Sequence, residues 1–355
     1  MTTSDIIKPM GLVERLAAGE SVIVAEGYLF EFERRGYLKA GHYVPEVVLQ
    51  HPDLVRQLHE EFVHAGSDVV LAFTYYAHRE KLRFIDREDD LEKINRTALR
   101  IARQVANETG TLMAGNLCNT NLPMTPGDEN TRQKIRDIMK EQVLWAVEEG
   151  ADYIVLETIG HLEEALIGLK VIQEFGKGLP AVVTMSIHIS ENSFDDVPIE
   201  DALSQVEKAG AAVVGLNCAR GPSTMLPVMK KIRQTCKGPL AALPVTFRVS
   251  NEEPTMQTLT DENGKRPYPA LEAHLNSREQ IAQFAKDCKE IGIQYVGLCC
   301  GNMACYIRTI AETLGRTPPA SKYSPNMDEN SYTREAIYNS KLHARVFKTK
   351  HVVNT

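Results

Sequence analysis

The chain contains 355 residues, more than the ~100–200 residues of a typical single domain, so it fits either two domains or one of the larger α/β architectures. Its 40 Lys and Arg residues are outnumbered by 47 Asp and Glu residues, and the net charge of −7 argues against nucleic acid or an anionic membrane surface as a partner. Hydrophobic residues make up 43% and charged residues 25% of the chain, as in ordinary globular proteins.

We expect neither a membrane segment nor a secretory signal. No apolar stretch approaches the ~18 residues of a membrane-spanning helix. Residues 1–10 lack the basic and then apolar layout of a secretory signal. The sequence therefore predicts a cytoplasmic protein.

Four junctions between a helix and a following strand are predicted along the chain. At each one a helical pattern ends at a glycine, and an apolar run begins three residues later. The glycines are Gly66, Gly150, Gly210 and Gly292. Glycine readily adopts the left-handed conformation that ends a helix, and a short link then leads directly into a strand. Three segments between predicted strands carry apolar residues at helical spacing, over 54–62, 91–105 and 135–146.

Eight strands are predicted between the helical segments. They cover residues 22–29, 68–76, 111–118, 152–159, 180–188, 211–218, 239–246 and 295–300. Most are continuously apolar, as expected of parallel strands that are covered on both faces. This order predicts an α/β fold, a single (β/α)₈ TIM barrel over residues 1–317. An open doubly wound sheet is the alternative, but no G-x-G-x-x-G phosphate loop follows the first strand.

Three connections are longer than a barrel needs, namely residues 119–131, 188–198 and 248–276. All three follow predicted strands, whose carboxyl ends carry the active-site loops of a barrel, so we expect them to act as lids. Residues 318–355 form a polar C-terminal tail outside the barrel, with a helical-looking stretch over 333–347. An oligomerisation arm, and hence a homo-oligomer, is one interpretation of this tail.

The seven cysteines are too few, and odd in number, for a disulfide framework. Buried cysteine commonly packs as a small apolar residue. That interpretation suits Cys118, Cys236, Cys288 and Cys305. The other three cysteines stand at the ends of predicted strands, which favours a different role.

Cys218 ends the sixth predicted strand, and Cys299 and Cys300 end the eighth. In a barrel these strand ends lie on the same rim, so the three thiols can converge. Three thiolates suit Zn²⁺ and leave its fourth tetrahedral position open, as in a catalytic site. Adjacent strand residues point to opposite faces, so both cysteines of the pair can bind one ion only where the strand breaks up, and Gly301 supplies that break. A disulfide between Cys299 and Cys300 is an alternative, as is simple packing.

Several sequence blocks resemble a known enzyme family. They are Glu26-Gly27 after the first strand, Gly-Leu-Asn-Cys at 215–218 and Gly-Leu-Cys-Cys-Gly at 297–301. These blocks are similar to those of the zinc-dependent homocysteine S-methyltransferase family. Its betaine-type members are also similar over residues 34–41, 73–77 and 161–165, and the likeness extends from about residue 11 to residue 319.

The resemblance implies a barrel enzyme that transfers a methyl group to the sulfur of L-homocysteine and forms methionine. It implies Zn²⁺ on Cys218, Cys299 and Cys300, with the homocysteine sulfur as the fourth ligand. A zinc-bound thiol is deprotonated and presented as a nucleophile, whereas a free thiol is only slightly ionised at neutral pH. In the family, the tyrosine that matches Tyr76 touches the metal site, and the position that matches Tyr43 lines the donor pocket.

The second substrate must be an onium compound, because a methyl group leaves readily only from positively charged nitrogen or sulfur. Aromatic faces hold such a cation well. The candidate faces are Tyr28, Tyr43, Tyr75 and Tyr76. Ordinary packing is the alternative role for each ring. Displacement from a caged cation needs no proton transfer and depends on positioning and desolvation.

Glu157 ends an apolar strand, where a carboxylate is costly without a partner. The family carries a glutamate there that binds the homocysteine ammonium group, and a structural ion pair with a loop Lys or Arg is the alternative. The family's first-strand turn usually reads Asp-Gly-Gly, whereas this chain has Ala25, Glu26 and Gly27. Either Glu26 reaches the amino group from a shifted position, or amino-acid binding has changed.

Thr158 stands where the betaine enzymes carry a tyrosine of the donor pocket, which predicts a wider or more polar pocket. Glycine betaine is the first donor to consider, and the sulfonium compounds dimethylsulfoniopropionate and S-methylmethionine fit the same logic. The predicted substrate-binding residues are Glu26, Gly27, Tyr28, Tyr43, Tyr75, Tyr76, Glu157 and Thr158. Of these, Tyr76 and Glu157 are predicted to be catalytic.

Two other functions are compatible with the three thiols. A barrel that stores or senses zinc would need neither an aromatic cage nor Glu157. A metal-assisted hydrolase would favour His and carboxylate ligands, whereas three thiolates suit sulfur chemistry.

Overall fold

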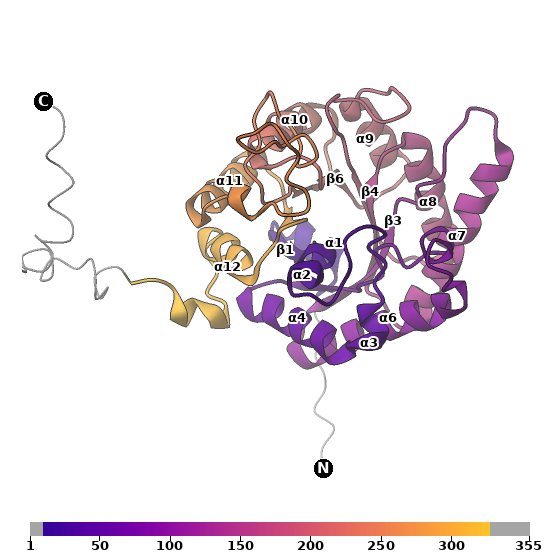
Figure 1. Cartoon of the computed structure of the whole chain (residues 1–355), viewed down its shortest axis with the longest axis horizontal. Coiled ribbons are helices and arrows are strands. Elements are labelled where there is room, and N and C mark those ends of the chain that lie inside the picture. The colour runs from indigo at the N-terminus through magenta and orange to yellow at the C-terminus, as the bar shows by residue number, and fades with distance from the viewer. Residues whose placement is uncertain (1–9, 327–355) are drawn as a thin grey trace, which may run out of the picture.

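Eight parallel strands form one sheet in the order β1-β8-β7-β6-β5-β4-β3-β2. Figure 1 shows the helices in a ring around these strands in the computed structural model, which describes residues 10–326. The strands are β1 (Val22–Ala25), β2 (Val69–Leu71), β3 (Leu112–Cys118), β4 (Tyr153–Ile159), β5 (Ala181–Met185), β6 (Val213–Asn217), β7 (Leu240–Leu243) and β8 (Tyr295–Leu298). The architecture confirms the predicted (β/α)₈ TIM barrel and is not an open doubly wound sheet.

Helices follow the strands and cover the outside of the barrel. The helices are α1 (Leu12–Ala17), α2 (Tyr28–Arg34), α3 (Val47–Gln50), α4 (Pro52–Ala65), α5 (Arg79–Arg83), α6 (Leu91–Thr109), α7 (Glu129–Glu148), α8 (Leu162–Phe175), α9 (Ile199–Lys208), α10 (Pro222–Thr235), α11 (Arg278–Ile291) and α12 (Ala304–Thr313). Short 3₁₀ turns are η1 (Glu88–Asp90), η2 (Glu272–His274) and η3 (Pro319–Tyr323). No helix within residues 10–326 is long and apolar enough to cross a membrane.

The predicted apolar stripes and glycine stops are present. Helices α4, α6 and α7 bury the apolar residues that carry the helical spacing. All four predicted junction glycines have positive φ angles, between 80° and 113°, the left-handed conformation that ends a helix. The predicted helical stretch over 333–347 lies outside the described residues.

The first two strands are shorter than the sequence predicts. We expected strands over 22–29 and 68–76, but β1 ends at Ala25 and β2 ends at Leu71. Tyr28 begins helix α2 instead, because the chain turns at Gly27, which has a φ of 86°. A Cβ atom at Gly27 would lie 2.3 Å from the Cys299 carbonyl oxygen, so the close approach of the two strand ends requires glycine there.

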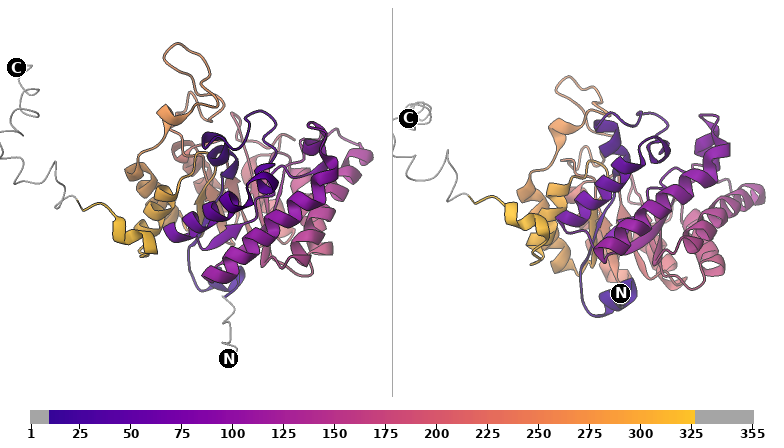
Figure 2. Two further views of the ribbon diagram at one scale, coloured as in Figure 1. Left: turned by 60° about the horizontal axis from the view of Figure 1, so that its bottom comes forward. Right: turned by 90° about the horizontal axis from the view of Figure 1, so that it is seen from below.

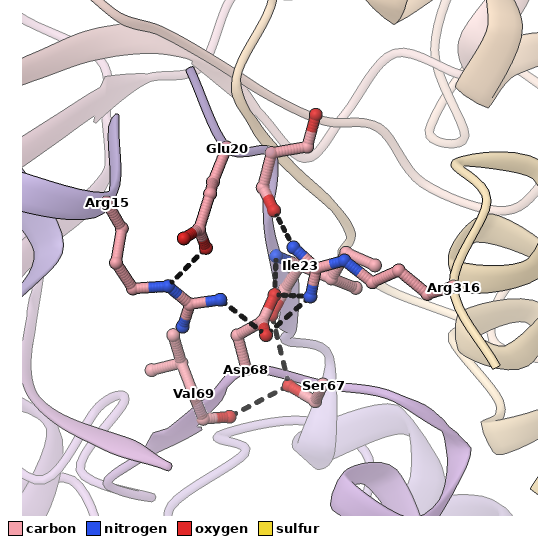
Figure 3. A network of polar contacts seen from close by, with 8 residues as sticks. Arg15, Glu20, Ile23, Ser67, Asp68, Val69 and Arg316 are labelled. Atoms are coloured by element: carbon pink, nitrogen blue, oxygen red, sulfur yellow. Dashed lines mark hydrogen bonds and ion pairs between the residues drawn. The ribbon is translucent and has the colours of Figure 1, made fainter. Parts of the chain in front are cut away.

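Asp68 closes the barrel between β1 and β2, the two strands at the ends of the ladder. Its N–H donates to the Ile23 carbonyl over 2.8 Å, and its carboxylate accepts the Ile23 N–H over 2.7 Å. Arg15 and Arg316 donate to the same carboxylate, at 2.8 Å and 2.5 Å (Figure 3). This network ties α1 and the segment after α12 to the seam of the barrel.

The barrel interior is filled by side chains near the amino ends of the strands and becomes polar toward their carboxyl ends. Tyr153 of β4 and Tyr295 of β8 face each other across the barrel, with their hydroxyl oxygens 3.0 Å apart. Glu157 lies four residues further along β4 and Cys299 lies one residue past β8, and a carboxylate oxygen of the first lies within 4.8 Å of the sulfur of the second. The carboxyl ends of the strands therefore place an acid and a thiol above a buried core.

The three predicted lid segments connect strands to helices at one end of the barrel. Figure 2 shows the orange loop between β7 and α11 projecting beyond that end. The indigo helix α1 lies at the opposite end of the barrel. The site must therefore lie at the carboxyl ends of the strands, where these loops meet.

Candidate active site

A cavity of about 590 Å³ lies at the carboxyl ends of the strands. Ten of the eleven predicted site residues line it. They are Gly27, Tyr28, Tyr43, Tyr75, Tyr76, Glu157, Thr158, Cys218, Cys299 and Cys300. Glu26, the eleventh, is buried beneath the cavity and does not line it.

The three strand-end thiols converge in this cavity. The sulfur of Cys300 lies 3.7 Å from that of Cys218 and 4.0 Å from that of Cys299, and all three lie within 4.8 Å of one another. All three cysteines are free, so the alternative of a disulfide between Cys299 and Cys300 is wrong. Gly301 has a φ of 82° just after β8 has ended, which is the predicted break in the strand.

The spacing of the thiols fits a tetrahedral zinc ion. Ligands at about 2.3 Å from zinc with tetrahedral angles stand about 3.8 Å apart, close to the two sulfur–sulfur distances of Cys300. Hydrogen bonds from Cys299 and Cys300 hold the pKa of the Cys218 thiol well below its usual range. A thiolate at this point is the form that binds a metal.

Glu157 is held by two amides. Asn116 of β3 donates to one of its carboxylate oxygens over 2.7 Å, and Asn217 of β6 donates to the other over 2.9 Å. No Lys or Arg pairs with Glu157 in the described part of the chain, so the alternative of an ion pair with a loop cation is wrong. The carboxylate is thus fixed in direction while it faces the cavity.

Glu26 and Glu157 form a buried acid pair. Asn217 also donates to Glu26, over 3.2 Å, and oxygens of the two carboxyls lie within 4.8 Å of each other and of the Cys299 sulfur. Burial raises the pKa of both groups, and that of Glu157 to about 7. Burial disfavours the charged form of each group, and the proximity of a second carboxylate adds to this effect on Glu26.

Four of the predicted site residues that are not glycine have left-handed backbone angles. They are Tyr43 (φ 54°), Tyr76 (φ 61°), Thr158 (φ 60°) and Cys218 (φ 60°). Such a conformation costs about 1–3 kcal/mol per residue and persists only where the surroundings fix it. For Thr158, the backbone N–H donates to the side-chain oxygen of Asn217 over 2.9 Å, which fixes the turn.

The predicted aromatic residues occupy different parts of the site. Tyr75 and Tyr76 lie side by side, with ring centroids 4.4 Å apart. Tyr43 stacks on Phe30, with centroids 5.7 Å apart and an angle of 10°. The ring of Tyr28 packs against aromatic side chains of the core, which leaves little of its surface for a ligand. These core contacts are with His59, Phe62 and Phe73.

Sequence reasoning missed several residues that line the cavity or hold its side chains in place. Asn116 and Asn217 were detectable, because each is an amide inside an otherwise apolar strand. His188 and Tyr268 line the cavity from two of the predicted lid segments. Nothing in the sequence of those long loops indicates which of their residues turn inward.

Comparison with known proteins gives a consistent result. The family model for homocysteine S-methyltransferase matches residues 27–314. The S-methylmethionine–homocysteine S-methyltransferase BHMT2 of Mus musculus is 35% identical over 323 residues, which cover 88% of this chain and 84% of that protein. Betaine–homocysteine S-methyltransferase 1 of Mus musculus is 34% identical over 332 residues, which cover 88% of this chain and 77% of that protein.

A solved structure shares the fold. The metallated form of the homocysteine methyltransferase MmuM from Escherichia coli matches with a TM-score of 0.66 and 15% identity, covering 84% of this chain and 98% of that chain. Its oxidised form matches with a TM-score of 0.65 and 16% identity, covering 83% of this chain and 96% of that chain. At these identities the likeness shows the architecture of the barrel.

Proposed function

Since this chain belongs to the homocysteine S-methyltransferase family, we propose that it uses Zn²⁺ to transfer a methyl group from an onium donor to the thiolate of L-homocysteine. Methionine is the product, and glycine betaine is the first candidate donor. As a member of this family the chain is a methyltransferase enzyme, so we do not retain a storage barrel or a hydrolase as its function.

The convergence of three thiols at the floor of an aromatic-lined cavity carries this proposal. Cys218, Cys299 and Cys300 have the spacing of tetrahedral zinc ligands. When bound there, Zn²⁺ would supply a Lewis acid that holds the acceptor sulfur in its thiolate form. Cys218 and Cys299 are buried and Cys300 is half-buried, so protein limits the access of water to the reacting atoms.

The acceptor amino acid is oriented by the acid pair. Glu157 faces the cavity with its direction fixed by Asn116 and Asn217, and it can accept hydrogen bonds from the substrate ammonium group. Glu26 is the acid that stands one position later than the family's usual aspartate in the first-strand turn. We interpret its role as indirect, through its effect on the charge state of Glu157. The ammonium group would supply a positive partner for this buried acid pair.

The donor loses a methyl group by in-line displacement. The thiolate sulfur forms a bond to the methyl carbon as the bond from that carbon to the onium atom breaks. The bonding pair stays on the nitrogen or sulfur of the donor, which leaves as a neutral amine or thioether. No proton moves in this step, so the residues contribute by positioning the cation against aromatic faces and by excluding water.

A sulfonium donor is the second candidate, and Thr158 favours it. This short side chain bonds to Asn217 over 2.9 Å through its hydroxyl and fills less of the cavity than the tyrosine expected in betaine enzymes. The two relatives described above differ in the donor that their names give, one S-methylmethionine and the other betaine.

A panel of labelled donors tests the proposal. The zinc-loaded enzyme is incubated with ¹³C-labelled L-homocysteine and a donor that carries trideuterated methyl groups, and methionine that contains the ¹³C label is measured by mass spectrometry. Glycine betaine, dimethylsulfoniopropionate and S-methylmethionine form the panel. We expect methionine with one trideuterated methyl group from at least one donor. Product that lacks the trideuterated methyl group in every case, or no product from any donor, would contradict the proposal.

A further inference from the structure

The loop between β7 and α11 places the ring of Tyr268 in the wall of the cavity. The Tyr268 hydroxyl donates to the Tyr43 hydroxyl over 2.9 Å. Its ring meets Phe30 edge-on, with centroids 5.8 Å apart and an interplanar angle of 75°. Two segments that are far apart in the sequence, around residues 30–43 and 268, therefore build one aromatic wall.

This wall lies beside the thiols, because Phe30 packs against the apolar cluster that contains Cys218 and Cys299. Burial raises the pKa values of the Tyr43 and Tyr268 hydroxyls. Both side chains therefore stay neutral phenols near the acceptor site. Tyr268 has 41% of its surface exposed, so much of its ring is not covered by protein.

The other aromatic pair of the cavity, Tyr75 and Tyr76, is less free to bind a cation. The ammonium nitrogen of Lys81 lies 3.9 Å from the centroid of the Tyr76 ring. A cation on one face of a ring weakens the attraction of the other face for a second cation, because like charges repel across so short a distance. Within residues 10–326, no Lys or Arg lies over the rings of Tyr43, Tyr268 or Phe30.

We propose that Tyr268 is a donor-binding residue, and that the wall it forms with Tyr43 and Phe30 holds the methylated onium group beside the thiols. This inference rests on the proposed function and names a part of its donor site. The hydroxyl bond between Tyr268 and Tyr43 anchors the long loop, so the wall is complete only while the loop is closed. Tyr43 also keeps a left-handed backbone, with a φ of 54°, which indicates that its contacts hold it in place.

Truncation of the ring tests the contact. In Tyr268→Ala, we expect the KM for the onium donor to rise about 2- to 30-fold, the range of one lost cation–π contact, with the KM for homocysteine changed less than twofold. Tyr37→Ala is the matched control, because Tyr37 has a similar exposure of 40% and does not line the cavity. A donor KM within twofold of wild type in Tyr268→Ala would overturn the inference.

Removal of the two hydroxyls tests whether the hydrogen bond between Tyr268 and Tyr43 holds the loop in place. Tyr43→Phe and Tyr268→Phe each keep the ring and lose the bond between the hydroxyls. If that bond holds the wall, each single variant raises the donor KM by a similar factor, and the double variant is no worse than either. Additive effects of the two changes, or no effect of either, would show that the bond does not anchor the loop and would overturn that part of the proposal.

Binding of a non-reactive cation separates this inference from the proposed reaction. We would titrate the zinc-loaded full chain with tetramethylammonium chloride in a calorimeter. Weaker binding to Tyr268→Ala than to wild type and to Tyr37→Ala supports the aromatic site, whatever donors the enzyme turns over. Equal binding to all three proteins, or none to wild type, contradicts the inference. Failure of methyl transfer with normal tetramethylammonium binding would instead count against the proposed function.

Discussion

Glu157 and Glu26 are adjacent in space, but only Glu157 reaches the cavity. In Glu157→Gln we expect the KM for homocysteine to rise by the equivalent of about 1.5–3 kcal/mol, the value of a hydrogen bond to a charged group. Glu26→Gln should cause a smaller rise, because this side chain acts through Glu157. Steady-state kinetics with homocysteine as the varied substrate measures both. An equal rise in the two variants would show that Glu26 contacts the amino group directly.

The acid pair also predicts a pH dependence of stability. Burial raises the folded-state pKa of Glu26, and that of Glu157 to about 7, above the ordinary glutamate value of about 4.3. Between these values the folded chain binds more protons than the unfolded chain, so this contribution to stability is present at low pH and is lost as the pH rises. The free energy of unfolding of the zinc-free chain, measured by urea denaturation, should therefore contain a contribution that falls from pH 5 to pH 8. This fall should be smaller in the Glu26→Gln, Glu157→Gln double variant than in wild type. An unchanged decline would contradict the assignment.

The tyrosines of the cavity should not be equivalent. Tyr43→Leu should weaken donor binding by roughly 0.5–2 kcal/mol, one cation–π contact. Tyr76→Leu should weaken it less, because Lys81 already lies over the Tyr76 ring. Donor KM values for the two variants test this order. If neither substitution changes the donor KM, the aromatic cage is wrong.

Prediction of single residues from the sequence succeeded where burial of that residue type costs free energy unless the side chain has a partner or a ligand. A strand-end glutamate and three strand-end cysteines met that condition, and the structure brings them into one cavity. Asn116 and Asn217 met it too but were not assigned a role. Tyr268 carried no such signal, because an aromatic residue in a long loop costs little wherever it points.

Among the elements, the strands were located from continuous apolar runs, and all eight lie inside the predicted ranges. The predicted ends of β5, β7 and β8 lie two or three residues too far along the chain, and those of β1 and β2 lie four or five residues too far. Apolar residues continue past both strands, and the chain leaves the sheet because of close approaches in three dimensions, such as that of Gly27 to the backbone of Cys299. A one-dimensional pattern does not contain that contact.

The seam between β1 and β2 depends on one carboxylate. Asp68 accepts hydrogen bonds from Arg15, Arg316 and the Ile23 N–H (Figure 3), and its side chain is only 13% exposed. Asp68→Asn should lower the free energy of unfolding by about 1.5–3 kcal/mol, measured by urea denaturation.

Glu20→Gln is the control for the seam. Glu20 also pairs with Arg15, but its side chain is 38% exposed, so its loss should cost less than about 1 kcal/mol. Equal losses in the two variants would show that Asp68 has no special role in closing the barrel.

For the whole molecule, the net charge of −7 agrees with small-molecule substrates rather than a polyanionic partner. The assignment of residues 318–355 as a tail outside the barrel stays a prediction. Its first turn, η3, lies against α4 and α12, so the tail begins in contact with the barrel.

The zinc content of the purified full chain tests the central claim most directly. We predict one zinc per chain in wild type, measured by inductively coupled plasma mass spectrometry against protein concentration. Cys218→Ser and a Cys299→Ser, Cys300→Ser double variant should lose the metal while circular dichroism shows an intact barrel. Cys305→Ser, which changes a cysteine outside the cluster, should keep it. Full zinc occupancy in either cluster variant, or no zinc in wild type, would contradict the account.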